Sequence, residues 1–161
     1  MKNSVLELLS NNARMKVRDL ADILNESKEN VIAAIDELEN DKIICGYHAV
    51  VNWSKTSNDK VTAIIQVSSK PTTDSGYDEV AKKIASYSEV TDLYLMSGHY
   101  EFTVIINGKT MKEVATFVAH KLATIEGVTG TLTSFVLTRY KLNGSNVELE
   151  NNNDQRLIVT P

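Results

Sequence analysis

Apolar residues in the first part of the chain recur at helical spacing in three separate runs. Residues three, four and seven positions apart lie on one face of an α-helix, so each run predicts an amphipathic helix. We expect the third helix to span about residues 28–41, with Ser27 as its N-cap. Two short helices joined by a tight turn, after a first helix, predict a helix-turn-helix unit. The runs are Val5, Leu8 and Leu9; Val17, Leu20, Ala21 and Leu24; and Val31, Ile35 and Leu38.

The helical pattern stops after Lys42, where the chain becomes rich in residues typical of β-strands. Residues 43–51 predict a strand that leaves the helices and forms a wing. Cys45 lies in this segment, and we expect it to be buried as a small apolar residue. A polar connector follows. We therefore predict a first domain of residues 1–53 and a linker of residues 54–60.

The region after the linker contains two copies of a strand–helix–strand pattern, offset by about 40 residues. Doubling this unit produces the order β-α-β-β-α-β. This is the ferredoxin-like arrangement, an antiparallel sheet with helices on one face. We therefore predict an α+β protein whose second domain covers residues 61–142. The expected strands are 61–67, 90–96, 102–106 and 128–140, and the expected helices are 76–87 and 111–122.

The face of this sheet opposite the helices is expected to carry apolar side chains that need a cover. A second copy of the chain is the simplest cover, which predicts a homo-oligomer. The final segment, residues 143–161, is polar at first and ends in an apolar stretch, 157–159. It is either a disordered tail or a tail that adds a strand to a sheet edge. The residues expected on the uncovered face are Ile64, Leu93, Leu95, Val104 and Ile106, or their neighbours.

Composition limits the kinds of protein that this chain can be. The 161 residues are 42% hydrophobic and 24% charged, as in soluble globular proteins, and carry a net charge of −4. No segment is basic, which argues mildly against tight nucleic-acid binding by a single copy. No apolar run reaches the roughly 20 residues of a membrane span, and the N-terminus does not resemble a secretory signal. Together with a single cysteine, these features predict a cytoplasmic protein without a membrane association.

Residues arranged for catalysis are scarce. His48, His99 and His120 lack the spacing of metal ligands, and the chain has neither a nucleophile elbow nor a glycine-rich phosphate loop. We therefore predict no metal site, no cofactor and no enzymatic activity. A small ferredoxin-like enzyme with a helical appendage is a rival interpretation, and the missing catalytic constellation counts against it.

The start of the third helix carries the residues best suited to contact double-stranded DNA. In a helix-turn-helix unit, the N-terminal end of this helix enters the major groove. There Asn30 suits an adenine edge, and Lys28 suits a guanine or a phosphate. Acidic residues further along the helix repel phosphate, so useful affinity requires several copies bound together. The predicted DNA-binding residues are Ser27, Lys28, Glu29, Asn30 and Ala33, with Arg14, Lys16 and Arg18 near the DNA backbone.

A second candidate site lies in the hairpin between the two central strand segments of the second domain. Gly98 supplies open backbone amides, Tyr100 an apolar ring with a polar tip, and Glu101 an acceptor for an amino group. Together with hydroxyls on the last strand, these groups suit the charged end of an amino acid. A plain turn beside a solvated strand is the alternative. The predicted effector-binding residues are Ser97, Gly98, His99, Tyr100, Glu101, Thr131, Thr133 and Ser134.

Stretches along nearly the whole chain match the pattern of one known family. They are residues 17–21, 43–47, 50–52 and 90–101, together with Ser27, Val31, Leu38-Glu39, Val128-Thr129 and residues 133–137. Through them the chain resembles the Lrp/AsnC, or feast/famine, transcriptional regulators. The resemblance implies an N-terminal winged helix-turn-helix and a C-terminal RAM domain. It also implies dimers formed through the RAM sheets, often four dimers in an octamer, with an amino-acid effector bound between dimers beside the glycine hairpin.

The chain departs from the family pattern at three places. Ala34 stands where the recognition helix usually has arginine, Glu101 replaces the usual aspartate after Tyr100, and the first domain is less basic than usual. The resemblance implies a sequence-specific, amino-acid-responsive transcriptional regulator. The alternative is an amino-acid-sensing oligomeric module with weak or lost DNA binding.

Overall fold

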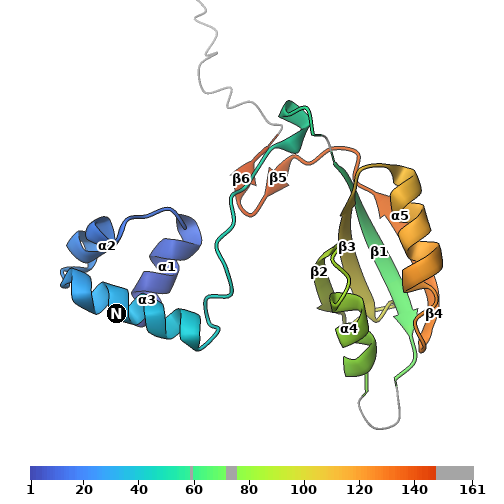
Figure 1. Ribbon diagram of the computed structural model, residues 1–161, viewed down its shortest axis with the longest axis horizontal. Helices are drawn as coiled ribbons and strands as arrows, with labels where there is room; N and C mark the ends of the chain where they lie inside the picture. Colours follow the sequence, from blue (N-terminus) through green and yellow to red (C-terminus); the bar gives the residue numbers. More distant parts are fainter. Residues whose placement is uncertain (59, 72–75, 148–161) are drawn as a thin grey trace, which may run out of the picture. The chain divides into compact units, whose positions relative to one another are not determined.

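The computed structural model describes residues 1–58, 60–71 and 76–147, and it divides the chain into two compact units (Figure 1). The first, here called the helical unit, comprises residues 1–50. The second, here called the sheet unit, begins at Val51. The division therefore falls three residues before the predicted end of the first domain.

The helical unit contains three helices that pack around one small core. They are α1 (Lys2–Asn11), α2 (Val17–Leu24) and α3 (Lys28–Asn40), and all three confirm the predicted helices. The backbone N–H of Asn30 donates to Ser27 Oγ at 3.1 Å, so Ser27 caps α3 as expected. Asn25 ends α2 in a left-handed conformation, with φ of 52°, which turns the chain between the two helices. The buried core residues are Val5, Leu9, Leu20, Ala21, Val31 and Leu38.

The prediction of a strand after α3 is wrong, because residues 43–51 form no strand. The N–H groups of Ile43 and Ile44 instead donate to the Leu38 carbonyl that ends the helix, at 2.9 and 3.0 Å. A β-strand exists only where a second strand completes its ladder, and no described residue pairs with this segment. Cys45 is consequently exposed rather than buried, with its thiol directed at the Lys42 carbonyl.

The sheet unit has the predicted β-α-β-β-α-β order. Its sheet is antiparallel, with strand order β2-β3-β1-β4. The helix predicted at residues 111–122 is confirmed as an α-helix followed by a π-helical turn. The elements are β1 (Val61–Ser69), α4 (Asp78–Ala85), β2 (Val90–Leu95), β3 (Phe102–Gly108), α5 (Met111–Phe117), η2 (Val118–Leu122) and β4 (Val128–Phe135).

Short elements precede and follow this sheet along the chain. The 3-10 helix η1 (Trp53–Lys55) precedes it. After β4, which ends at Phe135 rather than at the predicted Tyr140, β5 (Lys141–Leu142) and β6 (Ser145–Asn146) form a hairpin. Its turn is Asn143-Gly144, and both residues have positive φ, the conformation that a two-residue hairpin turn requires. The apolar stretch 157–159 lies outside the described residues.

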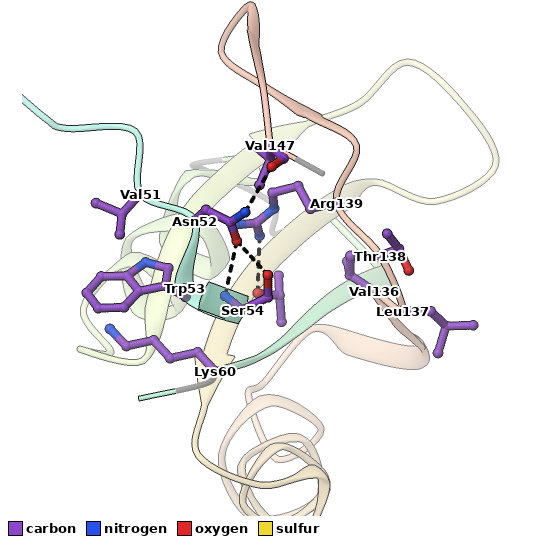
Figure 2. A pocket seen from close by; sticks show the side chains of 11 residues that line it. Val51, Asn52, Trp53, Ser54, Lys60, Val136, Leu137, Thr138, Arg139 and Val147 are labelled. Atoms are coloured by element: carbon purple, nitrogen blue, oxygen red, sulfur yellow. Dashed lines mark hydrogen bonds between the residues drawn. The ribbon is translucent and has the colours of Figure 1, made fainter. Parts of the chain in front are cut away.

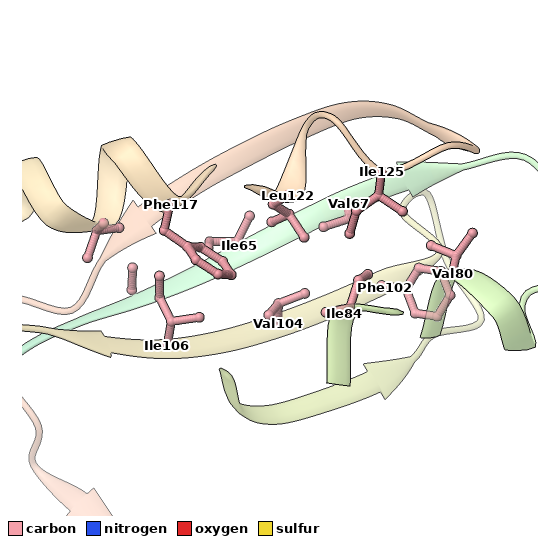
Figure 3. Packing of buried hydrophobic residues seen from close by; sticks show 12 residues of the cluster. Ile65, Val67, Val80, Ile84, Phe102, Val104, Ile106, Phe117, Leu122 and Ile125 are labelled. Carbon is pink, nitrogen blue, oxygen red and sulfur yellow. The ribbon is translucent and has the colours of Figure 1, made fainter. Parts of the chain in front are cut away.

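Alternate residues of the two central strands supply the core under α4 and α5 (Figure 3). Ile65 of β1 and Val104 of β3 lie opposite each other, and both are fully buried. They pack with Ile84 of α4, Leu122 of η2 and the ring of Phe102. Successive strand residues point to opposite faces, so the neighbours of these core residues lie on the uncovered face.

The uncovered face of the sheet carries a partly different set of side chains from the predicted one. Ile64 is on this face as expected and is 38% exposed. Val104, Ile106 and Leu93 instead belong to the core under the helices, because the register places Val104 beside Ile65 and not beside Ile64. The large apolar side chains that the register does place on this face are Ile64, Tyr94 and Leu132, with Ile105 beside them. Tyr94 and Leu132 are half exposed.

Candidate functional site

The exposed side of α3 begins at its capped N-terminus. Lys28, Glu29, Ile32 and Ala33 are all exposed there, and their spacing of one and four residues places them on one face of the helix. Ala34 is only 2% exposed and lies on the opposite, inward side. The position compared with the family's arginine is therefore part of the packing of the unit, and Ala33 is the alanine that faces outward.

Two predicted DNA-binding residues are already engaged in hydrogen bonds at the N-terminus of α3. Ser27 Oγ accepts the Asn30 N–H, so this hydroxyl serves as a cap. The Asn30 side-chain amide donates to Glu26 Oε2 at 3.1 Å. Recognition of an adenine edge uses both the amide N–H and the carbonyl of asparagine. The bond to Glu26 uses one of the two N–H donors of the amide, so one N–H and the carbonyl oxygen of Asn30 remain for a base.

The predicted cationic residues cluster at the start of α2. Arg14, Lys16 and Arg18 are all exposed, and Arg18 lies 3.7 Å from the carboxylate of Asp19. The backbone N–H of Arg14 donates to Asn12 Oδ1 at 3.1 Å, which shapes the turn that precedes α2. This arrangement leaves three cations at the surface of one short segment, as a contact with DNA phosphates requires.

The acidic residues of α3 are partly offset by partners inside the helical unit. Glu37 forms an ion pair with Lys2, and the hydrogen bond between them, with their charge attraction, raises the pKa of Lys2. Glu39 accepts a hydrogen bond of 2.7 Å from the Tyr47 hydroxyl. Partial burial and this bond raise the pKa of Tyr47. The Lys2 ammonium therefore offsets part of the repulsion expected from the C-terminal half of α3, whereas the neutral Tyr47 hydroxyl orients Glu39 without offsetting its charge.

Ile32 is not among the DNA-binding residues predicted from the sequence. It is 47% exposed in the middle of the outward face of α3, one turn after Lys28. An apolar side chain at such a position can contact the methyl group of thymine in the major groove. The sequence pattern could have identified Ile32 as an outward-facing residue, because it falls outside the apolar run that forms the inner face of this helix.

The candidate effector hairpin joins β2 to β3 and is closed by its backbone. The Met96 N–H donates to the Glu101 carbonyl at 2.8 Å. Ser97, Gly98 and His99 are exposed between them, and the His99 ring meets the half-buried Tyr100 ring edge to face at 4.9 Å. A Cβ on Gly98 would meet no atom within 4 Å. The hairpin therefore offers backbone groups and space on its outer side.

Glu101 ties this hairpin to the end of β1. Its Oε2 accepts the Ser69 N–H at 2.8 Å, and Ser69 Oγ donates to the Gly127 carbonyl at 3.1 Å, just before β4. The described residues give the second carboxylate oxygen of Glu101 no hydrogen bond, so it can accept from a donor such as an ammonium group. Ser69 is therefore part of the site's framework, although it is not among the residues predicted from the sequence.

The three hydroxyl residues predicted on the last strand do not share one face. Thr131 and Thr133 lie opposite Val67 and Ile65, on the side of the helices. Ser134 lies opposite Ile64, on the uncovered side. The two-residue period of a strand imposes this separation. Within one copy of the chain, Thr131 and Ser134 cannot line the same face of a site.

Comparison with known proteins places these features in a family. The model of the Lrp/AsnC ligand-binding domain matches residues 62–145. The uncharacterised HTH-type transcriptional regulator YugG of Bacillus subtilis (strain 168) is 38% identical over 161 residues, which is 99% of this chain and 96% of YugG. The chain belongs to the Lrp/AsnC family.

Solved structures of bacterial proteins share its fold. The structure of Escherichia coli AsnC has a TM-score of 0.65 and 26% identity, with 88% of this chain and 93% of AsnC covered. A regulator of Neisseria meningitidis, NMB0573, solved as an L-Met complex, has a TM-score of 0.68 and 22% identity, with 94% and 95% covered. The predicted family and the α+β fold class are thus confirmed.

The described residues of this Lrp/AsnC chain add two negative observations. No helix among them is long and apolar enough to cross a membrane. Within the same residues, no group of three or more His, Cys, Asp or Glu side chains is placed to hold a metal ion.

Proposed function

We propose that this Lrp/AsnC regulator binds double-stranded DNA through α3, in the cytoplasm, and alters its assembly when an amino acid binds beside the 96–101 hairpin. The observation that carries the DNA contact is the outward face of α3, with Lys28, Ile32 and Ala33 exposed on a capped helix. The exposed cations at the start of α2 support it, since phosphate contacts fix how such a helix sits in the groove.

DNA binding of this kind depends on assembly. The chain carries a net charge of −4, so one copy has little electrostatic attraction to DNA. The uncovered sheet face, with Ile64, Tyr94 and Leu132, is the surface through which a second copy would pack. Linked copies bind several DNA segments at once, and each further contact then benefits from a high effective concentration.

An amino acid is the effector class that the hairpin supports best. The second oxygen of Glu101 suits an ammonium group, and the backbone amides of the exposed residues 97–99 suit a carboxylate. NMB0573, which has the same fold, is solved with L-Met. A coupling of about 1–3 kcal/mol between effector and DNA is sufficient for regulation.

The test is DNA binding by fluorescence anisotropy, with DNA from upstream of the gene and a scrambled duplex as control. Raising salt from about 50 to 200 mM is expected to weaken binding by roughly a thousandfold or more if an assembly neutralises at least about six phosphates. Lys28→Gln is expected to lower this salt dependence. Lys112→Gln, an exposed lysine of the sheet unit, is expected to leave it unchanged. Equal binding to both duplexes at every salt concentration would contradict sequence-specific recognition.

Ile32→Ala is expected to remove a thymine contact. Loss of this apolar side chain is expected to weaken binding to the preferred DNA by about tenfold. Replacing the contacted thymine by uracil removes one methyl group. We expect this change to cost the parent protein about 0.8 kcal/mol of binding free energy and to leave the DNA affinity of the variant unchanged. Anisotropy with single thymine-to-uracil duplexes measures both. If the variant and the parent respond alike at every thymine, Ile32 does not contact a thymine methyl.

Gly98→Trp is expected to change the response to amino acids or the size of the assembly. The space beside Gly98 is open, so the indole fits within one copy and fills the volume that the effector and the neighbouring copy would use. The measurements are DNA affinity with each of the twenty amino acids and mass by light scattering. A variant unchanged in both assays would show that the hairpin is not the effector site.

An amino-acid-sensing module with weak or lost DNA binding is the second candidate. Glu29 and Asp36 are exposed on α3 and favour it, because both repel phosphate. The two candidates differ in the anisotropy test. A module without DNA binding changes its mass with an amino acid but binds neither duplex at low salt.

A further inference from the structure

A concave site in the sheet unit lies away from both candidate sites. It is a cavity of about 310 Å³ at the end of the sheet where β1 begins (Figure 2). Thr62 in its wall lies opposite Asn107, at the far end of β3 from the 96–101 hairpin. The cavity is within the size range of small-molecule sites and is separated from the hairpin by the length of β3.

Hydrogen bonds hold the walls of this cavity together. The Asn52 side-chain amide donates to the Val147 carbonyl at 2.9 Å, which ties the segment before η1 to the chain after β6. The Val136 N–H donates to the Thr62 carbonyl at 2.9 Å and continues the pairing of β4 with β1. Figure 2 shows the bond from Asn52 to Val147 as a dashed line. The site is therefore preformed by segments that are far apart in the sequence.

Two cations line the cavity. Arg139 Nη2 donates to Thr62 Oγ1 at 3.2 Å, and Thr62 Oγ1 in turn donates to Asn107 Oδ1 at 2.7 Å. This neutral chain orients the guanidinium but does not neutralise it. The Lys60 ammonium lies 4.3 Å from the centre of the Trp53 ring, a cation–π contact. Among the described residues, neither cation forms an ion pair, and no carboxylate lines the cavity.

This chemistry selects one class of ligand. A guanidinium has five N–H donors in a planar fork that matches a carboxylate or a phosphate, and the residues that the structure describes engage only one of them. The Trp53 ring and Val136 supply apolar walls for the rest of a small molecule. An ammonium group would meet two positive charges and no described carboxylate. The lining therefore favours an anion without an amino group.

We infer that this cavity binds a small organic anion, a carboxylate or phosphate compound that lacks an amino group, through Arg139 and Lys60. Such a ligand would differ from the amino acid proposed for the hairpin both in place and in charge. The regulator would then have a second small-molecule input on the sheet unit. This inference does not depend on DNA binding or on the amino-acid site.

Trp53 makes the inference directly testable because it is the only tryptophan in the chain and lines the cavity. Its fluorescence is titrated in the full-length protein with 4-methyl-2-oxopentanoate, inorganic phosphate and L-leucine, each to about 10 mM. We expect a saturable change with at least one of the two anions, and the responding anion tells a carboxylate from a phosphate. We expect none with L-leucine, whose ammonium group the cavity disfavours.

Arg139→Gln is expected to weaken this anion binding at least about tenfold, since it removes the charge-assisted bonds. Lys141→Gln is the matched control, because it removes one exposed charge two residues later, outside the cavity. If circular dichroism shows that Arg139→Gln is misfolded, Lys60→Gln provides the same comparison. Three outcomes would overturn the inference: no saturable response to either anion, equal effects of Arg139→Gln and Lys141→Gln, or a response to L-leucine that equals the anion response. Loss of DNA affinity in Arg139→Gln without any anion response would assign the cations to DNA phosphates instead.

Discussion

Ala34→Arg is expected to unfold the helical unit. Ala34 is 2% exposed on the inner side of α3, so an arginine there must bury its guanidinium or push the helix away from its neighbours. Placing an unpaired charge in a packed interior costs several kcal/mol. A unit of about 50 residues has a small core and little stability to lose. We expect loss of the helical signal of this unit, measured by circular dichroism during thermal unfolding.

Ala33→Arg is the matched control for this prediction. The same substitution, one residue earlier, places the guanidinium on the exposed face of α3 beside Ile32. We expect the fold to be unchanged and DNA affinity to rise, because the new cation faces the groove. An Ala34→Arg variant that is as stable as the parent would show that α3 packs through another face. The substitution that would give α3 the arginine implied by the family resemblance is thus the one that we expect the fold not to tolerate.

The helices could be predicted because their evidence is local. The run Val17, Leu20, Ala21 and Leu24 marks both the existence of α2 and its buried side within eight residues. The cap at Ser27 depends on groups three residues apart. The four long strands were likewise marked by continuous β-rich segments between turns, and their order followed from the repeated unit.

Features that depend on a partner could not be predicted in this way. Residues 43–51 have strand-like composition, but composition does not supply the second strand that a ladder needs. The face of the sheet on which Val104 lies depends on whether it pairs with Ile65 or with Ile64, and a shift of one residue in the register moves its side chain to the other face.

The hairpin of β5 and β6 was detectable from the sequence, because Asn143-Gly144 is a strong turn signal.

The same distinction between local and long-range evidence applies to the candidate sites. Exposed residues on the first turn of α3 follow from helical periodicity, so Lys28 and Glu29 could be placed from the sequence. The cavity beneath Arg139 could not, because it joins Asn52, Thr62 and Val147 through contacts across much of the chain. The tie between Glu101 and Ser69 spans 32 residues and has no local signal.

Ile64→Lys is expected to dissociate the assembly. Ile64 lies on β1 at the middle of the uncovered face, opposite Ile105 on β3 and Ser134 on β4. In a symmetric dimer the same patch is used by both copies, so one substitution brings two unpaired ammonium groups into one apolar interface. We expect the dissociation constant of the dimer to rise by roughly a hundredfold or more, since like charges in an interface cost several kcal/mol. Sedimentation equilibrium over a range of concentrations measures it.

Ile23→Lys is the control, because it makes the same chemical change at an isoleucine of the helical unit that is 59% exposed. We expect its assembly to match that of the parent. Ile64→Lys leaves α3 intact, yet it is expected to lose most of its DNA affinity because separate copies lack the effective concentration of linked ones. If Ile64→Lys stays assembled, the copies do not meet through this face. If it dissociates but binds DNA as before, one helical unit suffices despite the acidic charge of the chain, and the link between assembly and DNA binding fails.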